Sequence, residues 1–130
     1  MQEFRYKGKT LDELKRMELK EFMGLIPSRE RRSLKRGFTE QQKILLKKID
    51  LTLAGKYKKM IKTHCRDIII TPKMVGLTIY VHKGNGFDPI KIEPESIGFR
   101  LGYFVLTRKR VEHSSPGVGA TKSSASASVK

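Results

Sequence analysis

The sequence predicts an α+β fold built around one β-hairpin, with short helices and basic segments attached to it. Within residues 75–92, Leu77, Ile79 and Val81 alternate with polar and aromatic residues. This period of two places the apolar side chains on one face of a sheet. Residues 83–86 read Lys-Gly-Asn-Gly, which accept the positive φ angles of a tight reversal at little cost. The hairpin is therefore expected to be the scaffold of the fold.

The segments on either side of the hairpin carry weaker indications of structure. Pro89 cannot donate a hydrogen bond to a ladder, so the returning strand is expected at a sheet edge. Residues 67–71 are expected to form a short buried strand that ends at Pro72, and residues 51–63 to form a basic linker. Residues 97–107 are apolar but contain two glycines, which indicates turns or a close backbone approach rather than a long strand.

Capping signatures predict where the helices begin. Thr10 and Glu13 match a capping box ahead of a short helix, and a second short apolar helix is expected over residues 19–26. Both are expected to have little core of their own. A second signature at Thr39 predicts a helix over residues 40–50 that packs on the sheet. Its inward side is expected to consist of Ile44, Leu45 and Ile49.

The densest cationic run lies in residues 28–37, where five cations surround a single acid, Glu30. Gly37 is expected to end this helix. The run is interpreted as a phosphate-binding surface, because a charge so poorly compensated is unusual on a merely solvated face and guanidinium groups suit phosphate oxygens. The residues concerned are Arg29, Arg31, Arg32, Lys35 and Arg36.

Other cations allow two interpretations. Lys43 and Lys47 lie outside the apolar stripe of helix 40–50 and belong either to a solvated face or to an RNA-binding face. Lys62 precedes the hairpin and is included among the candidate RNA contacts. His82 alternates with apolar Val81, so it is expected on the outer face of the hairpin.

Composition points to a large polyanion as partner. Lys and Arg number 28 against 13 Asp and Glu, which gives a net charge of +15, and apolar residues make up only 38%. Such a chain repels itself when compact and forms a small core. Residues 1–27 are expected to be a short-helix extension, residues 28–107 an α+β core, and residues 108–130 a basic tail. The tail either has no fixed structure or becomes ordered on RNA.

No pattern in the sequence predicts catalysis, a metal site or a cofactor. P-loop, nucleophile-elbow and zinc-protease motifs are absent, and His64 with the single Cys65 lacks the paired spacing of metal ligands. Cys65 is expected to be a small packed residue, and a lone cysteine fits a reducing compartment. No apolar run approaches the ~20 residues that span a bilayer, and no signal peptide is evident at the N-terminus. No membrane partner is therefore expected.

Five segments in order resemble one known family. They are residues 4–14, 31–37, 62–79, 97–107 and 116–121, the last reading PGVGAT. Together they resemble the universal S-nineteen family of small-subunit ribosomal proteins, in its archaeal and eukaryotic form. The chain departs from the family signature at Tyr103, where an acid is usual, and at Lys83, where a polar amide is usual.

The resemblance implies a cytoplasmic ribosomal protein with a three-stranded sheet, located in the head of the small subunit and bound to its rRNA. It also implies that the thirteenth small-subunit protein is a neighbour among the head proteins, and that the tail is directed towards the decoding region and A-site tRNA. Residue by residue, it implies rRNA contacts at Arg31, Arg32, Lys35, Arg36, His64, Arg66, Arg108, Lys109, Arg110 and His113, with Gly117 and Gly119 passing close to RNA. Lys122 joins this set through the charge of the tail.

Two alternatives remain open at this point. The same basic surface could serve a free RNA- or DNA-binding regulator, which would bind a discrete nucleic acid as a folded unit. In a third interpretation, the chain is a protein-interaction module whose charge only keeps it soluble.

Overall fold

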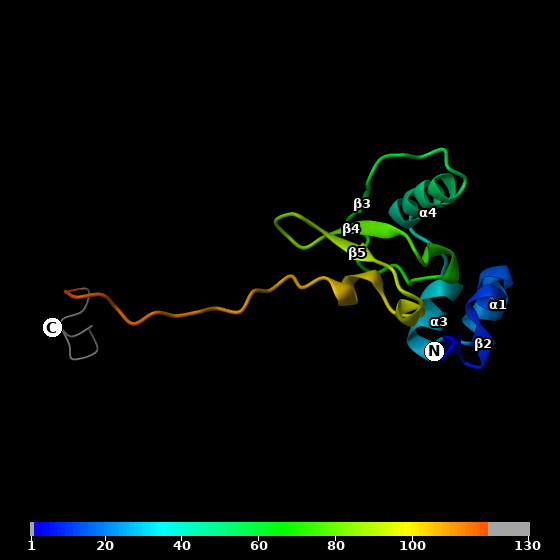
Figure 1. Cartoon of the computed structure of the whole chain (residues 1–130), viewed down its shortest axis with the longest axis horizontal. Coiled ribbons are helices and arrows are strands. Elements are labelled where there is room, and N and C mark those ends of the chain that lie inside the picture. Colours follow the sequence, from blue (N-terminus) through cyan, green and yellow to red (C-terminus); the bar gives the residue numbers. More distant parts are fainter. Residues whose placement is uncertain (1, 120–130) are drawn as a thin grey trace.

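A computed structural model describes residues 2–119 and confirms a mixed α+β fold (Figure 1). A two-stranded ribbon opens the chain, followed by four helices. The bounds of these elements are β1 Arg5–Tyr6, β2 Lys9–Thr10, α1 Leu11–Arg16, α2 Leu19–Met23, α3 Ser28–Lys35 and α4 Glu40–Leu53. Both predicted capping boxes are present, at Thr10 with Glu13 and at Thr39 with Gln42. Gly37 follows α3 with φ at +85°, as expected of a residue that ends a helix.

The three-stranded sheet consists of β3 Ile61–Thr63, β4 Thr78–His82 and β5 Phe87–Lys91, in the order β3-β4-β5. The predicted hairpin is confirmed, since β4 and β5 pair antiparallel with Ile79 opposite Ile90. The edge position expected from Pro89 is also confirmed, because β5 has a neighbour on one side only.

The prediction of a strand at 67–71 was wrong. The third strand is Ile61–Thr63, which lies parallel to β4 and alternates buried, exposed, buried. Residues 68–70 are buried and extended, but only Ile69 forms a bridge, with Arg100. The facing segment has Gly98 at φ +87°, which interrupts a regular ladder. The predicted linker 51–63 is accordingly shorter, because α4 extends to Leu53 and β3 begins at Ile61.

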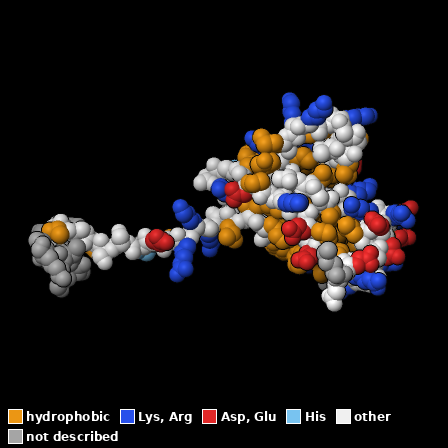
Figure 2. Space-filling view, in the orientation of Figure 1, with side chains coloured by type: hydrophobic (Ala, Val, Ile, Leu, Met, Phe, Trp, Pro, Cys, Tyr) orange, Lys and Arg blue, Asp and Glu red, His pale blue; other side chains and the backbone are white. Residues whose placement is uncertain are grey.

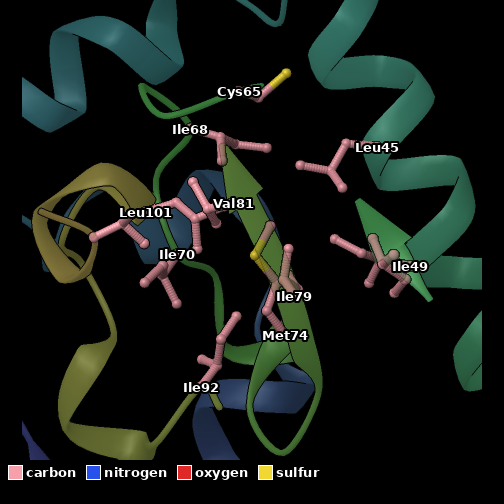
Figure 3. Packing of buried hydrophobic residues seen from close by; sticks show 12 residues of the cluster. Leu45, Ile49, Cys65, Ile68, Ile70, Met74, Ile79, Val81, Ile92 and Leu101 are labelled. Atoms are coloured by element: carbon pink, nitrogen blue, oxygen red, sulfur yellow. The ribbon is translucent and has the colours of Figure 1, made fainter. Parts of the chain in front are cut away.

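The larger core lies between α4 and the inner face of the sheet (Figure 3). Leu45 and Ile49 point from the helix towards Ile79 and Val81 of β4, and all four side chains are at most 2% exposed. The inward position predicted for Ile44 was wrong, since this side chain is 54% exposed. A helix turn of 3.6 residues places adjacent residues 100° apart, so Leu45 and Ile49 at i and i+4 share the buried stripe and Ile44 falls beside it.

A second core lies under the N-terminal helices, contrary to the expectation that they have little core. Leu14, Phe22 and Ile26 pack with Leu34 of α3 and with Ile69 and Ile97 of the central chain. Tyr6 also joins this cluster, and its burial, together with the nearby Glu30 carboxylate, raises the pKa of the phenol above its ordinary value.

Residues 97–107 form turns, as predicted, with a short 3-10 helix, η3, over Leu101–Phe104. The chain then leaves the core and runs away from it as an extended segment (Figure 1). Every residue from 106 to 119 is exposed, and none is in a helix or strand. Within residues 2–119, no helix is both long and apolar enough to cross a membrane.

Candidate nucleic-acid interface

Helix α3, together with its C-cap residue Arg36, presents four cationic side chains to solvent: Arg29, Arg32, Lys35 and Arg36. Its single acid does not neutralise them, because Glu30 is turned towards the core. The Glu30 carboxylate lies 3.9 Å from Nε of Arg100, and the two side chains are only 12% and 21% exposed. Arg100 also donates to Oγ of Ser33 at 2.8 Å. The outer side of α3 is therefore a nearly uncompensated cationic surface held rigidly on the core.

Arg31 of the same helix has a different environment. Its Nε donates to the carbonyl oxygen of Met23 at 2.9 Å, and Nη2 donates to that of Ile26 at 3.1 Å. These carbonyls belong to the end of α2 and the turn after it, where backbone acceptors lack helical partners. Arg31 thus fastens α3 to α2, and its predicted rRNA contact stays a prediction.

Arg66 is likewise engaged within the protein. Its guanidinium donates to the carbonyl oxygen of His82 at 2.7 Å, of Gly102 at 2.8 Å and of Val105 at 2.6 Å. A Cβ at Gly102 would lie 2.9 Å from Arg66, so the backbone approaches closely here, as the glycine pattern indicated. The side chain joins the hairpin to the root of the tail, which is a structural role that its charge alone did not reveal.

The outer face of the sheet carries exposed Lys62 and His64. The His64 ring stacks on that of His82, with centroids 4.2 Å apart, and both rings approach Phe87 edge-on. Sequence reasoning placed His82 on this face but missed Phe87. The signal lay in the hairpin register, which pairs His82 with Phe87. Cys65 is buried on the opposite side, as expected.

The two candidate lysines of α4 are exposed, but their surroundings differ. Nζ of Lys43 lies 3.2 Å from Glu40, one turn earlier in the helix. In the part of the chain that the structure describes, Lys47 has no salt bridge. Figure 2 shows Lys and Arg side chains at the top of the molecule, over α4 and the loop that follows it, whereas many acidic side chains lie on the side of the N-terminal helices.

The root of the tail adds a further cationic cluster, Arg108, Lys109 and Arg110, all exposed (Figure 2). With the hairpin turn they line an open groove of about 560 Å³. In that turn Nζ of Lys83 lies 2.9 Å from the Asp88 carboxylate. Lys83, which departs from the family signature, therefore has an acidic partner within the hairpin. His113, Gly117 and Gly119 follow on the exposed tail. Lys122 lies outside the described residues.

The structure thus spreads the predicted residues over α3, the sheet face, α4 and the tail instead of gathering them into one pocket. Within residues 2–119 no three His, Cys, Asp or Glu side chains are placed to hold a metal ion together. Several rigid cationic patches around a small core, continued by a cationic arm, define a protein that binds a large folded polyanion by charge and shape.

The chain matches the family model of ribosomal protein S19 over residues 32–113, which is more than half of its length, and it belongs to that family. It is therefore a structural protein of the small ribosomal subunit that binds small-subunit rRNA among other ribosomal proteins, and it is not an enzyme. The match includes α3 from Arg32 onwards, the sheet and the tail root. The N-terminal and PGVGAT segments of the resemblance lie outside it.

Proposed function

We propose that this chain occupies the head of the small subunit in the cytoplasmic ribosome, beside the thirteenth small-subunit protein. In this proposal its tail is directed towards the decoding region and A-site tRNA. One observation most strongly supports an RNA partner for the tail. From residue 106 to residue 119 every residue is exposed and none lies in a helix or strand, and the cations are concentrated at the root. A segment of this kind becomes ordered against an external partner, and its charge selects RNA.

We further propose that α3 is the principal electrostatic contact with rRNA. Its four outward cations sit on a helix that Arg31 and Arg100 fix to the core, so little conformational freedom is lost when phosphates bind. Each phosphate neutralised contributes about 0.7–0.9 to the slope of log K against log salt concentration. Replacing Arg29, Arg32 and Arg36 together by alanine should therefore lower the slope for small-subunit rRNA by about 2–3.

A matched control is available on the N-terminal helices. The triple replacement of Lys15, Arg16 and Lys20 by alanine removes the same charge from α1 and α2, whose first turns are acidic. It should change the slope by less than about 1, whereas a uniform effect of net charge would lower both slopes equally. Equal slopes for native chain and α3 variant would overturn the assignment of this helix.

The direction of the tail can be tested by tethered cleavage. Cys65 is buried, so Ser115→Cys provides one exposed thiol for an iron chelate that generates hydroxyl radicals. In reconstituted subunits with A-site tRNA, cleavage is expected in decoding-region rRNA and in the tRNA. The native chain, treated identically, should give none. Cleavage confined to rRNA far from the decoding region would contradict the proposed direction.

A further inference from the structure

The outer face of the three-stranded sheet carries a compact group of aromatic rings. His64 and His82 stack with centroids 4.2 Å apart and planes inclined by 27°. The Phe87 ring stands nearly perpendicular to both, at 5.4 Å from His64 and 5.0 Å from His82. These three rings are called the ring cluster below.

The ring cluster is fixed in place before any partner binds. The backbone N–H of Gly84 donates to Nδ1 of His82 at 3.1 Å, and Arg66 holds the carbonyl oxygen of the same residue. Phe87 and His82 are directly opposite in the hairpin register. His64 stacks on the His82 ring and is the exposed member of the cluster, while the other two rings are half-buried. One ring face is thus presented to solvent on a rigid support.

The chemistry around the ring cluster favours a nucleic acid over a protein. Nζ of Lys62 lies 5.5 Å from the centroid of Phe87, so an exposed cation stands beside the rings. A flat ring next to a cation matches a nucleotide, in which the base stacks and the phosphate is neutralised. An apolar protein anchor would instead favour a concave apolar pocket, and the exposed neighbours on this face include Lys62 and Thr78.

We propose that His64, supported by His82 and Phe87, stacks one unpaired base of small-subunit rRNA while Lys62 contacts its phosphate. This inference rests on the rRNA binding of the family and on the proposed phosphate contacts, and it adds a contact of a different kind, because stacking is insensitive to salt whereas phosphate contacts are not. Unpaired bases in loops and bulges are the bases that such rings can reach in folded RNA.

The test measures binding of the full chain to small-subunit rRNA transcript across a series of salt concentrations. His64→Ala should weaken binding about 5- to 160-fold, since stacking on one ring is of that size, with the salt slope unchanged. His64→Phe, which keeps a ring but has no ionisable group, should restore the affinity. Thr78→Ala, an exposed change on the same sheet face, should bind like the native chain. Thermal melting checks that each variant is folded.

The outcomes distinguish a failure of the stacking contact from a failure of rRNA binding. Native-like affinity of His64→Ala, or failure of His64→Phe to restore it, overturns the stacking contact while leaving rRNA binding intact. If His64→Ala keeps its rRNA affinity but loses a neighbouring protein from reconstituted subunits, the ring cluster is a protein contact and the proposal is wrong. If the native chain does not bind the transcript, the rRNA function and the stacking contact both fail.

Discussion

The Arg66→Ala variant should unfold more readily than the native chain, whereas the phosphate contacts of the protein with rRNA should not be weakened. Three carbonyl oxygens, at His82, Gly102 and Val105, would each lose the Arg66 donor, although that of Gly102 keeps a longer bond from the Val105 N–H, at 3.5 Å. At about 1 kcal/mol for each bond, the loss is about 3 kcal/mol in the free energy of unfolding. For a chain of this size that corresponds to a fall of about 10 °C in melting temperature.

The assay is urea unfolding, with the free energy extrapolated to water, together with the salt slope for rRNA measured where the variant is folded. Arg32→Ala is the matched control, because Arg32 is an exposed cation without a salt bridge in the described residues. It should leave the free energy of unfolding within about 0.5 kcal/mol of native and lower the slope by about 1. Native stability of Arg66→Ala together with a lowered slope would contradict the structural role of this side chain.

Three further outcomes follow from packing and burial. Gly98→Ala should lower the melting temperature more than Gly76→Ala. Both glycines have φ near +90°, but only a Cβ at Gly98 would meet the Tyr6 hydroxyl, at 2.8 Å. Equal falls in melting temperature would exclude that clash. Because the pKa of Tyr6 is raised in the folded state, its contribution to stability is present below pH 10.0 and is lost as the pH rises above that value. The free energy of unfolding should therefore fall more steeply at alkaline pH in the native chain than in Tyr6→Phe. Parallel curves for the two proteins would contradict this prediction. Ile44→Lys should melt within a few degrees of native while Leu45→Lys should not fold, as judged by circular dichroism, since only Leu45 is buried; similar behaviour of the two would contradict the orientation of α4.

The sequence predicted the elements whose signals are local. Both capping boxes and the hairpin depend on residues within a few positions of one another, and all are present. Strand β3 was missed because three residues with a central lysine carry too short an alternation to be distinguished from a linker. Its strand character comes from pairing with β4, whose partner residues lie eighteen positions further along the chain.

In the candidate site, too, local features were predicted from the sequence and long-range contacts were not. Charge and spacing identified α3 as a cationic surface, but they could not separate Arg31 from its neighbours. Which arginine meets free carbonyl groups depends on where α2 ends in space. Arg66 is similar, because its three acceptors lie between 16 and 39 residues further along the chain. The type of a side chain predicts what it can bind. Tertiary packing decides whether the N–H donors of a given arginine remain available for RNA or are used by backbone carbonyl groups.

Sedimentation of the tagged full-length chain from a cell lysate, with and without ribonuclease, tests the central claim most directly. The predicted result is co-migration with small ribosomal subunits at moderate salt, and loss of that co-migration after RNA digestion. Migration as a free species, or with a discrete nucleic acid of another kind, would instead favour a free RNA- or DNA-binding regulator. A protein complex that survives ribonuclease would equally contradict a structural role held by rRNA.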